Sequence, residues 1–243
     1  MNTKLKLGLL SLSAALLTAC GGGGGGGSSV NTAEGLWQGP SSTGATVTVA
    51  VLENGESWGG ATVGTSLVSA LAGTATGNGT SFAASGSEFV FSSNSVGTGT
   101  YTGTVTQKQR IQAASNNGST INLAYNSYYD QGVTAADIAG SYTLSGRSAR
   151  YSIPAMTFTI GSTGNFTIVQ TGCTTTGTAT PRASGKAIVN VTATGTGVSC
   201  ALSSGVAMNG IAVLDKSVTP NSLYFIALNS AKTDGLILLG NKN

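Results

Sequence analysis

Histidine is absent from this chain of 243 residues, and charged side chains make up only 8% of it. Without histidine, the Ser-His-Asp and Cys-His arrangements that activate a nucleophile cannot be built. Zinc and copper sites draw mainly on histidine and cysteine, and the chain has only three cysteines. We therefore expect no catalytic residues, no metal site and no cofactor, and a protein that is not an enzyme.

The few charged residues are also dispersed. Glycoside hydrolysis needs two carboxylates about 5–10 Å apart, whereas Glu53 and Glu56 flank an Asn-Gly pair and are typical of solvated turn residues. Calcium sites need several clustered carboxylates, and nucleic-acid binding needs clustered lysine and arginine. Neither kind of cluster is present in the sequence, so no nucleic-acid partner is expected.

Residues 1–19 have the layout of an export signal, with Lys4 and Lys6 before an apolar run over residues 7–17. The run is too short to span a bilayer permanently. The following Leu-Thr-Ala-Cys20 resembles the lipobox of bacterial lipoproteins, which implies a lipid (palmitate-type) attachment at Cys20 and a membrane anchor. In such lipoproteins an Asp after the cysteine retains the protein in the inner membrane. Here Gly21 follows, which favours the outer membrane and the cell surface.

Residues 20–33 are expected to form a flexible tether, because they contain seven consecutive glycines that have no side chains to pack. This tether resembles those of Gram-negative surface lipoproteins such as the transferrin-binding and factor-H-binding proteins. In those proteins a glycine run holds a β-barrel body away from the membrane. The resemblance covers only the first thirty residues or so.

The rest of the chain alternates apolar and polar residues with a period of two, as in residues 46–51, 157–160 and 165–168. Turn signals such as Asn54-Gly55 separate these segments. The pattern predicts an all-β protein with two consecutive antiparallel meander domains, barrel-like and lipocalin-like, over residues 34–130 and 131–243. A sandwich remains an alternative, because strand patterning alone does not separate it from a barrel.

A weak internal duplication supports the two domains, and a short helical turn is expected at residues 134–137 between them. Gly35-Leu36-Trp37 opens the first half and Gly140-Ser141-Tyr142 opens the second. The Gly-x-Trp opening is similar to that of lipocalin-type barrels, where the tryptophan closes one end. Residues 223–228 and 236–239 are continuous apolar runs, which predicts strands buried on both faces.

Cys173 and Cys200 remain once Cys20 is assigned to the lipid. In an exported protein these two cysteines are expected to form a disulfide, with two free thiols as the alternative. Four aromatic residues are candidate binding residues: Trp58, Tyr125, Tyr128 and Tyr129. The alternative for Trp58 is core packing, and for the tyrosines it is sealing of the interface between the domains.

The body also resembles uncharacterised proteobacterial lipoproteins. The shared features are Gly35 to Gly39, Tyr129-Asp130, the Thr-Pro-Arg-Ala-Ser-Gly turn at residues 180–185, and Thr233-Asp234-Gly235. This resemblance spans most of the body and implies a surface lipoprotein, but it brings no activity with it.

These features together favour a lipid-anchored surface protein of the outer membrane, with a role in adhesion, in binding a host or envelope protein or glycan, or in envelope structure. The alternative is a lipocalin-like carrier of a small apolar ligand in the periplasm, which requires a cavity of several hundred Å³. A third possibility, an envelope hydrolase, requires a pocket that holds two carboxylates.

Overall fold

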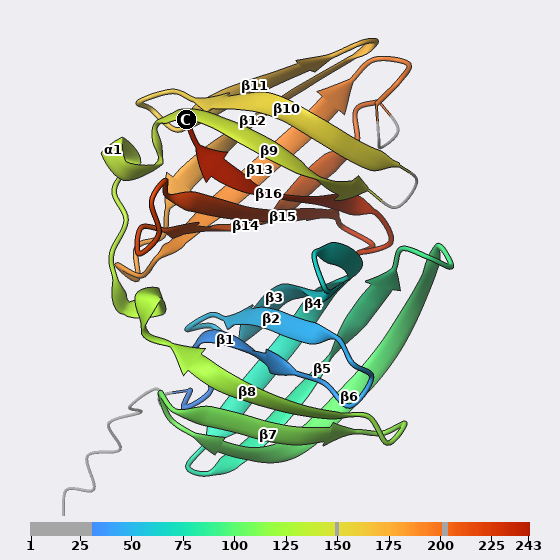
Figure 1. Ribbon diagram of the computed structural model, residues 1–243, viewed down its shortest axis with the longest axis vertical. Coiled ribbons are helices and arrows are strands. Elements are labelled where there is room, and N and C mark those ends of the chain that lie inside the picture. The colour runs from blue at the N-terminus through green and yellow to red at the C-terminus, as the bar shows by residue number, and fades with distance from the viewer. Residues whose placement is uncertain (1–30, 149–150, 201–203) are drawn as a thin grey trace, which may run out of the picture.

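The structure is a computed structural model that describes residues 31–148, 151–200 and 204–243. The predicted signal peptide, Cys20 and the glycine run lie outside the described residues. The described chain forms two consecutive closed barrels, each with eight antiparallel strands in meander order (Figure 1). The all-β, two-barrel prediction is therefore confirmed, and closure of both sheets decides for barrels over sandwiches.

The first barrel contains strands β1 to β8, with these bounds: Gly35–Pro40, Thr46–Val51, Glu56–Val63, Ser66–Asn78, Ser81–Val90, Ser95–Thr106, Arg110–Ser115 and Thr120–Asn126. The second contains β9 to β16, with these bounds: Gly140–Ser148, Ser152–Ile160, Asn165–Gln170, Cys173–Pro181, Ile188–Thr196, Ala207–Asp215, Ser222–Asn229 and Gly235–Lys242. In each barrel the first strand pairs with the last, through Trp37 opposite Tyr125 in one and Ser145 opposite Leu239 in the other.

A short connection joins the barrels through a 3₁₀ turn, η1 (Ser127–Asp130), and a single-turn helix, α1 (Ala135–Ile138). The helix begins at Thr134, whose hydroxyl accepts a hydrogen bond from the backbone N–H of Asp137, while the Asp137 carboxylate accepts one from the N–H of Thr134. This capping box satisfies backbone donors that a helix start would otherwise leave unpaired. The expected helical turn at residues 134–137 is thus present.

The internal duplication seen in the sequence has a structural counterpart. Trp37 and Tyr142 each occupy the third position of the first strand of a barrel, and both are fully buried. Each donates a hydrogen bond to the carbonyl four residues earlier, from Nε1 of Trp37 to Ala33 and from the hydroxyl of Tyr142 to Ile138, both at 2.8 Å. The two barrels therefore begin with the same local arrangement.

An apolar contact joins the outer wall of the first barrel to that of the second, whose strands β14 and β15 lie on the side next to the first barrel in Figure 1. From the first barrel it takes these residues: Leu36, Ala50, Leu52, Leu67, Ala70, Ala72, Phe89 and Phe91. From the second barrel it takes these: Ile188, Ile211, Val213, Ile226, Leu228 and Ile237. An ion pair between Arg182 and Glu53, 2.7 Å apart, also connects the barrels, so Glu53 is not merely a solvated turn residue.

This contact explains the continuous apolar runs near the end of the chain. On β15, Leu223, Phe225 and Ala227 point into the second barrel, whereas Ile226 and Leu228 lie in the contact between barrels. Both faces of the strand are buried, so no position along the run needs a polar side chain. The predicted burial on both faces is confirmed for β15 and for residues 236–238 of β16, whereas Leu239, the last residue of the second apolar run, is exposed.

The interior of the second barrel is filled by large side chains. Four rings meet there, from Tyr142, Phe158, Phe166 and Phe225, with neighbouring centroids 4.9–6.3 Å apart. These tilted and edge-to-face arrangements are the ones that aromatic pairs prefer. Cys173, which is buried, and Cys200 form the predicted disulfide in this barrel.

Candidate functional site: a cavity in the first barrel

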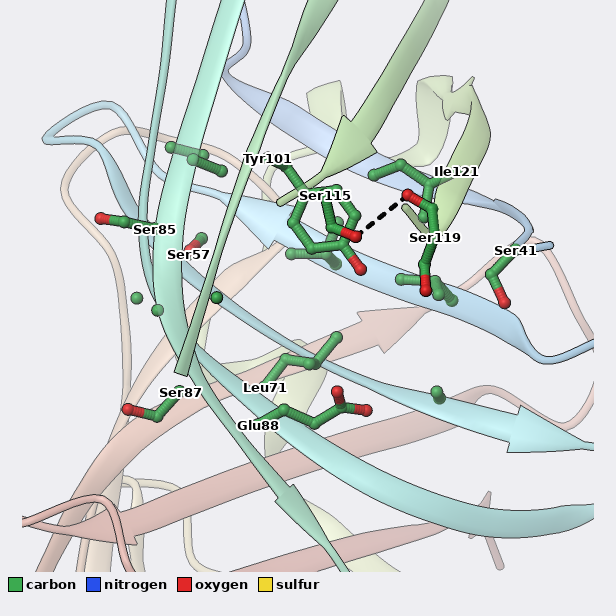
Figure 2. A pocket seen from close by; sticks show the side chains of 18 of the residues that line it. Ser41, Ser57, Leu71, Ser85, Ser87, Glu88, Tyr101, Ser115, Ser119 and Ile121 are labelled. Carbon is green, nitrogen blue, oxygen red and sulfur yellow. Dashed lines mark hydrogen bonds between the residues drawn. The ribbon is translucent and has the colours of Figure 1, made fainter. Parts of the chain in front are cut away.

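The first barrel is hollow. A cavity of about 500 Å³ runs through its interior, and its wall comes from all strands except β1 (Figure 2). Its apolar lining consists of these residues: Ala45, Val47, Val49, Val51, Ala61, Val63, Val68, Leu71, Ala72, Ala75, Phe82, Ala84, Ile111, Ile121 and Leu123. A volume of this size lies within the range of pockets that hold small organic ligands.

Small inward-facing residues keep this cavity open. The wall includes Ala84 and Gly86 on β5 and Gly97 and Gly99 on β6. A Cβ added at Gly97 would meet nothing within 4 Å, and one at Gly99 would meet only the side-chain oxygen of Asn116, at 3.8 Å. An eight-stranded barrel has just enough interior for side chains to fill it, so small residues at several inward positions leave room for a ligand.

One end of the first barrel is closed. Trp37 is fully buried there among Val51, Ala75 and Phe82, and its ring meets that of Tyr125 edge-on at a centroid distance of 5.2 Å. The segment before β1 joins β4 at this end, where the N–H of Thr32 donates to the carbonyl of Gly77. The lipocalin-like expectation for the Gly-x-Trp opening therefore has a structural basis.

The other end is polar and carries the turns β1–β2, β3–β4, β5–β6 and β7–β8. Polar cavity residues at and near this end are Ser41, Thr43, Ser87, Glu88, Thr98, Ser115, Asn116, Asn117 and Ser119. The hydroxyl of Ser115 hydrogen bonds to the carbonyl of Ser119 at 3.1 Å and also to the side-chain oxygen of Asn117. The cavity thus combines an apolar interior with a polar opening, which we call the mouth.

Tyr101 on β6 contributes a phenol to the cavity wall (Figure 2). Burial raises its pKa, the charge of Glu88 raises it further, and a hydrogen bond with Ser115 offsets part of this increase. The phenol therefore stays neutral at ordinary pH and can donate one hydrogen bond.

The aromatic residues that the sequence suggested for binding lie elsewhere, and none of them lines the cavity. Trp58 points outward and packs against the contact between barrels, with Lys232 5.8 Å from its ring centroid. Tyr128 is buried in the core of the second barrel, and Tyr129 is buried in the contact between barrels. Tyr125 lies at the closed end, beside Trp37.

The sequence interpretation overlooked the residues that do line the cavity, above all Tyr101 and Glu88. A signal for them exists in the strand β6, where glycines alternate with larger residues in Gly97-Thr98-Gly99-Thr100-Tyr101. With a period of two, these glycines share a face with Tyr101. A run of missing side chains on the inward face indicates a void.

Asp130 connects the two barrels near the closed end. Its carboxylate accepts hydrogen bonds from Lys186 at 2.8 Å, from Lys108 at 2.9 Å and from the Tyr125 hydroxyl at 2.9 Å. Partial burial by itself raises the pKa of Asp130, but these three donors outweigh it and hold the pKa well below its ordinary value. The charged form is therefore the one that the folded state stabilises.

We expect Asp130→Asn to lower the free energy of unfolding by about 1 kcal/mol at neutral pH, since the ion pairs are partly exposed. Because the folded-state pKa lies below the unfolded one, this stabilisation is present above about pH 4 and is lost as the pH falls further. Urea midpoints at pH 7 and pH 3 should therefore differ less in the variant than in the wild type. If the urea midpoint fell by the same amount between pH 7 and pH 3 in both proteins, the stabilising role of the Asp130 carboxylate would be contradicted.

The part of the cavity wall that the structure describes carries one carboxylate, that of Glu88. The two-carboxylate arrangement of glycoside hydrolysis would need a second one beside it. Within residues 31–148, 151–200 and 204–243, no group of three or more potential metal ligands gathers. The same residues include no helix that is long and apolar enough to cross a membrane.

Comparisons with known proteins leave the cavity as the main guide to function. No protein-family model, no curated protein and no solved structure matches the chain.

Proposed function

We propose that this protein is a lipid-anchored envelope protein whose first barrel binds a small, largely apolar ligand. The observation that carries the proposal is the cavity of about 500 Å³, lined mainly by aliphatic side chains and open at a polar mouth. Burial of apolar surface stabilises a complex by roughly 25 cal/mol per Å² removed from water. An apolar molecule of matching size would therefore gain affinity in this cavity.

The contrast between the two barrels supports the same proposal. Both have eight strands and the same connectivity, yet aromatic rings pack the interior of the second and leave no comparable space in the described residues. A packed interior is the ordinary state of a barrel of this size. The first barrel forgoes the stabilisation that filling would bring, which is typical of a ligand site.

The cavity favours a role as a carrier of a small ligand over a role in adhesion or in envelope structure, because neither of the latter roles needs a hollow interior. The location of the protein at the outer membrane remains part of the proposal. This location is inferred from the export signal, the lipid attachment at Cys20 and the tether. The Cys173–Cys200 disulfide supports an oxidising compartment. We propose an outer-membrane lipoprotein that holds its ligand close to the membrane.

Two neighbouring alanines on β5 allow a matched test. Ala84 lines the cavity, whereas Ala83 is exposed and does not. In Ala84→Trp the indole would occupy the cavity, so the affinity for a neutral apolar probe, N-phenyl-1-naphthylamine, should fall at least tenfold. Ala83→Trp should leave this affinity unchanged. Titrations would use residues 20–243 with Cys20→Ser, the exported form without lipid, so that no detergent competes for the cavity.

The result is informative in either direction. Probe binding to the wild type that Ala84→Trp weakens and Ala83→Trp preserves would support the proposal. Absence of probe binding to the wild type, or equal binding by all three proteins, would overturn it. Circular dichroism of each protein verifies that the sheet content is retained.

A further inference from the structure

The mouth of the cavity carries a single kind of charge. Glu88, near the end of the strand β5, extends its side chain into the cavity beside Leu71 (Figure 2). Every other described residue of the cavity wall is neutral. An amphiphile whose apolar chain enters the interior would have its headgroup at the mouth, where this carboxylate lies.

None of the described ion pairs includes Glu88, and the basic side chain described at this end of the first barrel, Arg147 of the second barrel, lies over the ring of Phe91, 5.2 Å from its centroid. The described ion pairs join Lys108 and Lys186 to Asp130, Arg182 to Glu53, and Lys216 to Asp137. Within residues 31–126 the basic residues are Lys108 and Arg110 alone, and both lie at the β6–β7 turn, at the opposite end of the barrel from the mouth.

The uncharged groups at the mouth can both donate and accept hydrogen bonds. The Ser115 hydroxyl hydrogen bonds within the β7–β8 turn, and the side-chain oxygens of Asn116 and Asn117, which also accept hydrogen bonds from this region, are acceptors there. An ammonium group carries three donors and no acceptor, so it would pair with the carboxylate and with these oxygens. A carboxylate headgroup would instead meet a like charge, and the described residues of the cavity wall include no lysine or arginine.

We infer that the cavity selects amphiphiles with a cationic headgroup, such as long-chain amines, over neutral or anionic molecules with the same chain, through Glu88. This inference rests on the proposed ligand-binding function and names the chemical class of the ligand. The apolar chain supplies most of the affinity within the barrel. The carboxylate at the mouth supplies the discrimination, because a like charge there is penalised while an opposite charge is attracted.

Displacement of N-phenyl-1-naphthylamine by three probes of equal chain length tests this inference: decylammonium, decanol and decanoate, each below its micellar concentration. The wild type should bind decylammonium about three- to tenfold more tightly than decanoate at low salt, as expected for a partly exposed charge pair. Added salt should reduce this ratio by screening. Glu88→Gln should bring it close to one, and Glu88→Lys should reverse it.

Glu56→Gln is the matched control. It removes the same charge from the same barrel, but Glu56 begins β3 near the closed end and does not line the cavity. The wild-type ratio should persist in this variant. Since Glu88 is exposed, its substitutions should not impair folding, and N-phenyl-1-naphthylamine binding by each variant verifies an intact cavity.

The possible failures are distinct. If the three probes bind the wild type equally well, or if Glu88→Gln keeps the preference for decylammonium, the headgroup inference is wrong while the ligand-binding function stands. If N-phenyl-1-naphthylamine itself does not bind the wild type, the proposed function fails and the headgroup inference fails with it.

Discussion

Phe158→Ala is expected to lower the free energy of unfolding by about 3–5 kcal/mol, the usual cost of removing a large buried aromatic side chain. Phe158 is fully buried, and its ring contacts those of Tyr142, Phe166 and Phe225. Its removal leaves a void that these rings cannot close while the strands keep their register. Guanidinium denaturation followed by far-ultraviolet circular dichroism would measure the loss.

The neighbouring Thr157 provides the control, because its side chain is exposed on the outer face of the same strand, β10. Thr157→Ala should change the stability by less than about 1 kcal/mol. A loss below 1 kcal/mol for Phe158→Ala would mean that the second barrel is loosely packed. The contrast between a filled and a hollow barrel, on which the proposed function depends, would then be lost.

Trp37→Ala is expected to have an effect of similar size, about 3–5 kcal/mol, on the first barrel. The side chain is fully buried, its Nε1 donates to the carbonyl of Ala33, and its ring contacts Tyr125. Removing it takes away both the packing at the closed end and the anchor of the segment that precedes β1. The fluorescence of Trp58, the other tryptophan of the chain, would report unfolding of this variant.

Gln38 is exposed next to Trp37, so Gln38→Ala serves as the comparison. If Trp37→Ala were as stable as Gln38→Ala, the first barrel would not need its buried tryptophan. The two large predictions also address different barrels, and separate unfolding transitions would appear if the barrels unfold independently. A single transition in both variants would indicate that the contact between barrels couples them.

The strand pattern was predictable because a strand with one buried face alternates its residues with a period of two. Residues 46–51 and 165–168 display that alternation and lie in β2 and β11. The closure of each sheet into a barrel was not predictable in the same way. It depends on pairs such as Trp37 with Tyr125, which are 88 positions apart and show no local signal.

The candidate site was largely unpredictable, because aromatic side chains attract attention in a sequence and missing side chains do not. Tyr128 and Tyr129 stood out near the domain junction, yet they are buried in a core and in the contact between barrels. The cavity instead depends on small residues such as Ala84 and Gly99, whose lack of bulk has meaning only when they face one enclosed space.

The sequence by itself determined the chemical character of this protein: no histidine, few charges, alternating strands and a cysteine pair suited to a disulfide. These are properties of composition and local order, and they need no knowledge of distant contacts. Only the tertiary structure decided which barrel is hollow, which strands contact the other barrel, and that Glu88 faces the cavity. Those outcomes depend on how side chains from distant strands share a closed volume, and that volume exists only once both sheets have closed.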